Sequence, residues 1–260
     1  MLTTNSIRKT NPVILNVANM VTPQHVADAI NFYGGSPIMF TDEREAAALT
    51  NISSGVVFNM GSTNEDTLRN VIASGKVANK RGIPVVIDPV AIGATELRQA
   101  NFARAAKEVN FNVIRGNAGE IAYLANVNWA ANGIDAGNGD ADIATIAQKV
   151  AKKYDCWVVL SGEQDIVTDG ETTYCVDNGH PYFQTNVGSG DMLDGILATA
   201  IAVENDLKAL VRATATFSIA GEIAGEKYPT QPASFFVELF NQLATITDDD
   251  IDTRMKIHQL

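Results

Sequence analysis

Short apolar runs alternate with amphipathic segments along much of this chain, and this alternation constrains the fold more than any other feature. Helical periodicity occupies most of the intervals between the runs, at residues 65–80, 96–108, 118–124 and 140–153. Alternation of this kind predicts an α/β fold, with a largely parallel central sheet flanked by helices. The runs expected to form buried strands are 13–17, 37–40, 56–59, 84–88, 112–115 and 156–160.

The first helix has clear local signals. Thr22 and Pro23 are typical of an N-cap and a first helical turn. Val26, Ile30 and Tyr33 follow at helical spacing and form one apolar face. We therefore expect a helix that begins at Pro23 and packs against the sheet by this face.

After residue 160 the pattern changes. Residues 165–168 and 172–176 are typical of a β-hairpin with its turn at Asp169-Gly170. From Asp191 onward the chain is helical and rich in alanine, and the acidic residues 248–252 are expected to form a solvated end. No linker or internal repeat is evident, so we expect residues 1–260 to form a single domain.

The charge balance excludes several classes of partner. The chain has 19 Lys and Arg against 30 Asp and Glu, a formal net charge of −11. Nucleic-acid and anionic-membrane surfaces need clustered Lys and Arg, so neither partner is expected. No apolar run approaches the ~18 residues of a membrane span. Residues 1–10 also lack the apolar core of a signal peptide, so a cytoplasmic location is expected.

Several familiar motifs are absent from the sequence. Cys156 and Cys175 have no metal or redox spacing, and the three histidines have no metal-ligand spacing. Neither the G-x-x-x-x-G-K-[ST] phosphate loop nor the G-x-G-x-x-G dinucleotide fingerprint occurs. Residues 137–140, Gly-Asn-Gly-Asp, lack the final Glu of a calcium loop and are interpreted as a loop and helix cap.

The strongest local signal is Gly188-Ser189-Gly190-Asp191, which leads into the helical segment 196–203. Two glycines before a helix allow backbone N–H groups to converge on an anion at the positive end of the helix dipole. Asp191 would then stand beside this cradle, where it could take a proton from a substrate hydroxyl. The alternative is that Asp191 only caps the helix.

Other polar residues follow the predicted strands, where ligands of open α/β sheets bind. Asp88 could hold a hydrated Mg²⁺ or form a turn before proline. Arg115 suits phosphate recognition because its charged guanidinium donates in a fork. Arg115 and Glu120 could equally belong to an ordinary helix cap, and Ser161 is interpreted first as a loop residue.

Taken in order, these segments resemble the hydroxyethylthiazole kinase family, a branch of the ribokinase-like superfamily. The resemblance runs from about residue 12 to residue 243 and implies a ribokinase-like fold. Each segment alone is a weak signal, whereas the ordered set is specific. The matching segments are 18–21 (Ala-Asn-Met-Val), 34–39 (Gly-Gly-Ser-Pro-Ile-Met), 59–62 (Asn-Met-Gly-Ser), 88–94 (Asp-Pro-Val-Ala-Ile-Gly-Ala), 114–121 (Ile-Arg-Gly-Asn-Ala-Gly-Glu-Ile), 161–170 (Ser-Gly-Glu-Gln-Asp-Ile-Val-Thr-Asp-Gly) and 188–191 (Gly-Ser-Gly-Asp).

The resemblance implies a reaction and a set of roles. The reaction is transfer of the ATP γ-phosphoryl group to the primary hydroxyl of 4-methyl-5-(2-hydroxyethyl)thiazole, with Mg²⁺, in thiamine biosynthesis. The family also implies a homotrimer whose thiazole pockets lie between subunits. The implied roles are general base for Asp191, anion hole for Gly188, Ser189 and Gly190, Mg²⁺ site for Asp88 and Glu120, ATP contact for Arg115 and Ser161, and thiazole contact for Asn19, Val21, Met39 and Gly188.

The chain departs from the family pattern at informative positions. Asp191 stands where the family usually has Cys; aspartate is the base of the wider superfamily, which leaves a sugar or another alcohol open as the substrate. Asp194 replaces a small residue of the family pattern. We expect it either to lie beside Asp191, where repulsion between the two carboxylates raises one pKa, or to point to solvent. Ala18 in place of Thr and Asp28 in place of Asn also bear on substrate identity.

Three alternatives to the thiazole kinase therefore stay open. One is a ribokinase-like kinase for another small alcohol or sugar, and another is the related repair enzyme that acts on hydrated nicotinamide nucleotides. The third is a non-catalytic thiazole-binding sensor. Intact Asp88, Arg115, Glu120 and Asp191 speak against the sensor, because loss of activity usually removes a metal or base residue.

Overall fold

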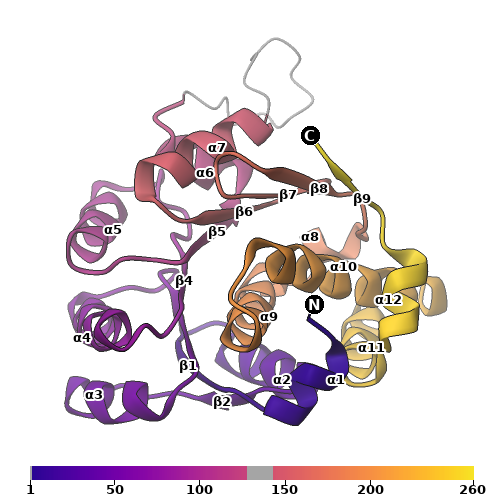
Figure 1. Cartoon of the computed structure of the whole chain (residues 1–260), viewed down its shortest axis with the longest axis horizontal. Coiled ribbons are helices and arrows are strands. Elements are labelled where there is room, and N and C mark those ends of the chain that lie inside the picture. Colours follow the sequence, from indigo (N-terminus) through magenta and orange to yellow (C-terminus); the bar gives the residue numbers. More distant parts are fainter. Residues whose placement is uncertain (1, 128–142) are drawn as a thin grey trace.

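The computed structural model describes residues 2–127 and 143–260, whose strands form one nine-stranded sheet (Figure 1). From β1 to β6 all pairings are parallel, and β7, β8 and β9 extend one edge with antiparallel pairings. This arrangement confirms the predicted α/β fold with a largely parallel sheet. In spatial order the strands are β2 (Ser36–Ile38), β1 (Val13–Val17), β3 (Gly55–Asn59), β4 (Val85–Asp88), β5 (Val113–Asn117), β6 (Trp157–Ser161), β7 (Asp165–Thr168), β8 (Thr173–Val176) and β9 (Ile257–Gln259).

Helices cover both faces of the sheet (Figure 1). Successive residues of an inner strand point to opposite faces, so Ile14 joins one apolar core and Leu15 joins the other. The first core includes α1 (Thr4–Thr10), α2 (Pro23–Tyr33), α9 (Ser189–Val203), α10 (Leu207–Lys227), α11 (Pro232–Thr245) and α12 (Asp248–Arg254). The second includes α3 (Glu43–Ile52), α4 (Glu65–Arg81), α5 (Glu96–Glu108), α6 (Ala118–Leu124) and α7 (Ile143–Tyr154). The short α8 (Tyr182–Thr185) precedes α9.

Helix α9 lies against the sheet and is covered by α2 and α10, so it is buried along most of its length. Gly195 allows α2 to come close, because a Cβ atom at this position would lie 2.7 Å from Ile30 Cγ1. The predicted apolar face of α2, Val26, Ile30 and Tyr33, is buried. This packing fixes the N-terminus of α9 at the carboxyl edge of the central strands.

The expectation that residues 248–252 form a solvated end is confirmed for the exposed side chains of Asp249, Asp250 and Asp252 and is wrong for Ile251. They belong to α12, which begins with a capping box between Thr247 and Asp250 and buries Ile251 completely. Arg212 of α10 donates to Asp252 Oδ1 at 2.5 Å and to Asp248 Oδ1 at 2.9 Å. The acidic stretch is therefore anchored by a cation distant in the sequence and by one apolar side chain.

Some predictions fall partly or wholly outside the described ranges. The loop at residues 137–140 and the first residues of the predicted helix 140–153 lie there, and α7 is described from Ile143. Within the described ranges, no helix has both the length and the apolar character needed to cross a membrane. Cys156 and Cys175 are both buried. The single-domain organisation stays a prediction.

Candidate active site

The parallel strands bring polar residues from distant parts of the sequence to one edge of the sheet. Asn59 and Asp88 are paired in register at the ends of β3 and β4, and Asn117 and Ser161 are paired at the ends of β5 and β6. Asn19 lies two residues beyond the end of β1. This is the edge at which ligands of open α/β sheets bind, so the strand-end residues of the sequence do converge.

The Asp191 carboxylate is held by three side chains from two other segments, the start of α2 and the end of β3. Asn19 Nδ2 donates to Oδ2 at 2.9 Å, and Asn59 Nδ2 donates to Oδ1 at 2.9 Å. The Thr22 hydroxyl also donates to Oδ2. Gly188, not Asp191, occupies the N-cap of α9. The carboxylate is thus oriented in the first helical turn by groups outside its own helix.

Thr22 occupies the N-cap position of α2, as predicted, but its hydroxyl does not cap that helix. Asn19 Oδ1 instead accepts from the backbone N–H groups of Val21 at 2.7 Å and Thr22 at 3.0 Å. This division of labour frees the Thr22 hydroxyl to bind Asp191. A side chain that ordinarily stabilises a helix start is here used at the site, which sequence reasoning missed.

The glycines of the Gly-Ser-Gly-Asp segment are required sterically. Gly188 has φ +93°, and a Cβ atom there would lie 2.6 Å from Thr22 Cγ2. A Cβ atom on Gly190 would lie 2.3 Å from Arg115 Nη1, so the guanidinium is in contact with the helix backbone. Between them, Ser189 donates to the Asn186 carbonyl at 2.8 Å. The first amides of α9 and the Arg115 guanidinium therefore lie side by side, so that one anion could bind to both.

Arg115 is the centre of a buried polar cluster. Its Nη1 donates to Asp88 Oδ2 at 2.9 Å, and its Nη2 donates to Ser161 Oγ at 2.5 Å. Its Nε lies 3.8 Å from Asp194 Oδ1. Asp194 has no exposed surface, so the alternative in which it points to solvent is wrong. The physical reason is that α9 presents this residue to the ends of β3 and β4, where Asn59 and Arg115 accommodate it.

Burial shapes the protonation of these acids. Burial raises the pKa of Asp88 to about 7, although the neighbouring Arg115 opposes the shift. Burial also raises the pKa of Asp194 well above its ordinary value, and the Asp88 charge adds to this effect. Among the described residues, Asp88 Oδ1 and Asp194 Oδ1 are buried and have no hydrogen-bond partner. Carboxylate oxygens of Asp88, Asp191 and Asp194 lie within 4.8 Å of one another, which suits a hard cation.

Glu120 differs from these three acids because both of its carboxylate oxygens accept hydrogen bonds from backbone N–H groups. Its Oε1 accepts from the Ala91 N–H at 2.7 Å, and its Oε2 accepts from the Asn117 N–H at 2.8 Å. The Glu120 N–H donates back to Asn117 Oδ1 at 3.0 Å, which completes a capping box on α6. Glu120 therefore joins the loop after β4 to the start of α6, and its role at a metal stays a prediction.

A cavity of about 690 Å³ opens beside this cluster. Arg115, Ser161, Ser189 and Gly190 form the part of its wall nearest to Asp191. Aromatic and polar residues that sequence reasoning did not single out form much of the rest. They include Asp165, Asp177, His180, Phe183 and Phe217.

Asp165 and Arg98 support the site without a local sequence signal. Asp165 Oδ1 accepts from the Gly162 N–H at 3.0 Å, and burial raises the pKa of Asp165 to about 6. Arg98 Nη1 donates to the Val90 carbonyl at 2.9 Å and its Nη2 to the Gly61 carbonyl at 2.7 Å. Arg98 thereby joins the loops after β3 and β4. Only the position of these loops at strand ends could have suggested such supports.

The residues predicted to bind the thiazole differ in their burial. Asn19 is buried and in contact with it, as described above. Val21 is 65% exposed and its neighbour Met20 is 81% exposed. Met39 is half-buried and directly follows β2 at the end of the sheet. Val21 and Met20 thus present apolar surface close in sequence to Asn19, uncovered within the chain described here.

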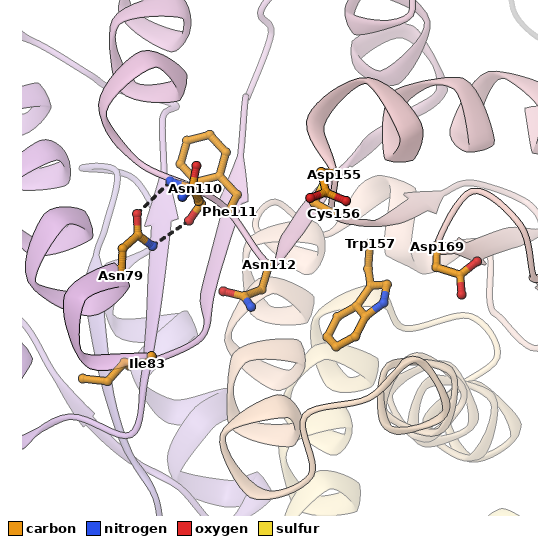
Figure 2. A pocket seen from close by; sticks show the side chains of 10 residues that line it. Asn79, Ile83, Asn110, Phe111, Asn112, Asp155, Cys156, Trp157 and Asp169 are labelled. Atoms are coloured by element: carbon orange, nitrogen blue, oxygen red, sulfur yellow. Dashed lines mark hydrogen bonds between the residues drawn. The ribbon is translucent and has the colours of Figure 1, made fainter.

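A second cavity, of about 480 Å³, lies at the opposite edge of the sheet, where β4, β5 and β6 begin (Figure 2). Asn79 Nδ2 donates to the Asn110 carbonyl at 2.8 Å, and the Asn110 N–H donates to Asn79 Oδ1 at 2.8 Å. Asn112 Oδ1 accepts from the Val85 N–H at 2.8 Å. These bonds join the loop before β5 to α4 and to β4, and they lie at the end of the sheet opposite the predicted site residues.

The fold of the chain is ribokinase-like. A ribokinase-like superfamily protein from Enterococcus faecalis has a TM-score of 0.66 at 13% identity, with 93% of this chain and 94% of that chain covered. A pyridoxal kinase from Staphylococcus aureus in complex with AMP-PCP has a TM-score of 0.65 at 15% identity, with 96% and 99% covered. At these identities the likeness shows the fold alone.

The chain belongs to the hydroxyethylthiazole kinase family, whose model matches residues 4–249. It is 41% identical to the hydroxyethylthiazole kinase of Latilactobacillus sakei, over 98% of this chain and 96% of that protein. The structure of the hydroxyethylthiazole kinase protein from Pyrococcus horikoshii has a TM-score of 0.90 at 30% identity, with 99% and 97% covered. The family predicted from the ordered motifs is therefore confirmed.

Proposed function

We propose that this chain transfers the γ-phosphoryl group of ATP to the primary hydroxyl of 4-methyl-5-(2-hydroxyethyl)thiazole, in thiamine biosynthesis. Its relatives at about 40% identity are named hydroxyethylthiazole kinases, which supports this substrate. The observation that carries the proposal is the position of Asp191. Its carboxylate is oriented by Asn19, Thr22 and Asn59 beside the start of α9.

In the proposed reaction, Asp191 accepts the proton of the substrate hydroxyl as that oxygen forms a bond to the γ-phosphorus. The bond between the γ-phosphorus and the β–γ bridging oxygen breaks, and ADP leaves with the electron pair. The first amides of α9, at Gly188, Ser189 and Gly190, donate to the phosphoryl oxygens where negative charge is concentrated. The steric requirement for glycine at positions 188 and 190 supports this role.

ATP binding is assigned to the cavity of about 690 Å³. Arg115 and Ser161 form its wall next to α9, which places a cation and a hydroxyl where phosphates would enter. The aromatic residues Phe183 and Phe217 form an apolar part of the wall. A cavity with an apolar region and a few convergent polar groups suits a nucleotide.

Magnesium fits the residues at the strand ends. Asp88 would hold it, because Asp88 Oδ1 is buried without a hydrogen-bond partner among the described residues. Glu120 would orient the surrounding loop through its bonds to Ala91 and Asn117. When bound, the metal neutralises charge on the β- and γ-phosphate oxygens of ATP.

The thiazole is assigned to Asn19, Val21, Met39 and Gly188. The exposed apolar surface of Met20 and Val21 supports a pocket that a second subunit completes, as expected for a cytoplasmic homotrimer with sites between subunits. Size-exclusion chromatography with light scattering tests this assembly. A monomer that is fully active would contradict the shared pocket.

The proposed activity is tested by coupled ADP release with the purified chain, ATP, Mg²⁺ and the thiazole alcohol. Turnover that depends on all three additions is the expected result. Because Asp191 matches the base of the wider superfamily, the same assay includes a panel of sugars and small alcohols. Activity on a sugar with none on the thiazole alcohol would overturn the proposed substrate but not the kinase class.

A further inference from the structure

Acidic groups outnumber cations at the carboxyl edge of β4 and β5. Asp88, Glu120 and Asp194 are buried, and Asp191 is half-buried beside them. Among the described residues, the cation that pairs with this group is Arg115, at Asp88 and Asp194. With one cation beside four acids, the carboxylates cannot all be ionised and paired within the described part of the chain, and an unpaired ion is costly in a low-dielectric environment.

The hydrogen bonds show which of these acids have oxygens available for a ligand. Both oxygens of Asp191 and both oxygens of Glu120 accept hydrogen bonds. Asp88 Oδ1 and Asp194 Oδ1, by contrast, are buried with no hydrogen-bond partner in the described part of the chain. Asp194 has no exposed surface, its Oδ2 accepts a long bond of 3.4 Å from Asn59, and its carboxyl group is close enough to that of Asp88 for the two side chains to share a hydrogen bond when one of them is protonated.

We propose that Asp194, together with Asp88, forms a divalent-cation site that this chain fills before nucleotide binds. Mg²⁺ and Mn²⁺ prefer carboxylate oxygens, and two such oxygens from different elements lie within 4.8 Å of each other here. This inference rests on the proposed function, because the same cation would later neutralise charge on the phosphates of ATP.

The site changes the order in which the kinase assembles. In a site with one carboxylate, Mg²⁺ is held largely by substrate phosphates and arrives with the nucleotide. A second buried carboxylate allows the cation to bind first and reduces the repulsion between the acids and an incoming triphosphate. The competing arrangement is a proton shared between Asp88 and Asp194, which would leave nucleotide-free metal affinity low.

The test is a Mn²⁺ titration of the purified full-length chain without nucleotide, with free Mn²⁺ measured by electron paramagnetic resonance. We expect the wild-type chain to bind Mn²⁺, and we expect Asp194→Asn to weaken that affinity by about 10-fold or more. Asp249→Asn is the matched control, because it removes the same charge from an exposed position in α12. Its affinity should equal that of the wild type.

Asp194→Ser, which removes the carboxylate and leaves a smaller side chain, repeats the test if the Asn variant fails to fold. The inference is overturned if the wild-type chain binds no Mn²⁺ without nucleotide, or if a folded Asp194 variant binds it as tightly as the wild type. Turnover of the thiazole alcohol is measured separately on the wild-type chain. Its absence would refute the proposed function and leave the Mn²⁺ result standing, so the two failures are distinguishable.

Discussion

The central sheet has a cavity at each end of its parallel strands, which we call the amino edge and the carboxyl edge. The two cavities are of comparable size, but polar groups are satisfied at one edge and left without partners at the other. At the amino edge, Asn79 and Asn110 exchange two hydrogen bonds and Asn112 binds a strand N–H (Figure 2). At the carboxyl edge, Asp88 and Asp194 each keep a buried oxygen without a partner among the described residues. Buried polar groups are normally satisfied, so the exceptions mark the edge built for a ligand.

The comparison also separates stability from function. Satisfied asparagines at the amino edge stabilise the attachment of the loop before β5 to α4 and to β4. Buried acids at the carboxyl edge destabilise the free chain, since burial disfavours their charged forms. We therefore expect substitutions at the carboxyl edge to alter turnover or to increase stability. A substitution at the amino edge should lower stability alone.

The largest effect is expected from Asp191→Ala. Removal of the proposed base should lower kcat about 10²- to 10⁴-fold, because a positioned general base contributes about that much. The Kd for ATP, measured by calorimetry, should change little, since Arg115 and Ser161 line the nucleotide cavity independently of this carboxylate. Unchanged turnover would mean that Asp191 is only a structural part of the helix start.

Asp165→Asn is expected to stabilise the chain. Burial raises the pKa of Asp165 from 3.8 to about 6, so the native state binds more protons than the unfolded state between pH 4 and pH 6. The free energy of unfolding therefore falls as pH rises through that window. The penalty above pH 6 is about 3 kcal/mol, at about 1.4 kcal/mol per pKa unit.

The substituted amide keeps an oxygen that can accept from the Gly162 N–H, as Asp165 Oδ1 does. Denaturant unfolding should show Asp165→Asn more stable than the wild type at pH 8 and equally stable near pH 4. Asp249→Asn, on an exposed position, should follow the wild type at both values. A variant less stable than the wild type at pH 8 would show that the charge of Asp165 stabilises the loop.

A smaller loss is expected from Gly190→Ala. The new Cβ atom would lie 2.3 Å from Arg115 Nη1, so the guanidinium must move away from the start of α9. Misplacement on this scale should lower kcat/KM about 10²-fold, with the larger change in the KM for ATP. Gly179→Ala is the matched control, because it lines the same cavity but its Cβ atom meets nothing within 4 Å. Equal kinetics for the two variants would contradict the proposed contact.

Much of this edge could be predicted from the sequence. The apolar runs predicted β1 and β7 with their observed bounds, and helical periodicity did the same for α5 and α6. Parallel pairing then brings every strand end to one edge, so Asp88, Arg115 and Ser161 were candidates before the structure was known. Gly188 and Asp191 followed from the short segment at the start of α9.

The rest depends on contacts that no local pattern encodes. Thr22 has the sequence signal of a helix cap, and only the tertiary arrangement turns its hydroxyl toward Asp191. The sequence left open whether Asp194 faces solvent or the site, because residue types alone do not show how α9 is rotated relative to the sheet. The anchoring of the acidic tail was likewise missed, since its partner Arg212 lies on α10. The periodicity of the sequence predicts where helices and strands lie. Polar contacts between residues distant in the sequence become visible only in the folded structure.

The smallest effect, and the sharpest check of the contrast between the two edges, is expected from Asn79→Ala. This change removes both hydrogen bonds between Asn79 and the Asn110 backbone, which should lower the free energy of unfolding by about 1–2 kcal/mol. Asn110→Ala is the control, because those two bonds use only the backbone of residue 110. Denaturant unfolding should separate the two variants, while kcat and KM stay at wild-type values in both. A lower kcat/KM for a folded Asn79→Ala variant would show that the amino edge is coupled to the site. In that case, the presence or absence of hydrogen-bond partners would not separate the structural edge from the functional edge.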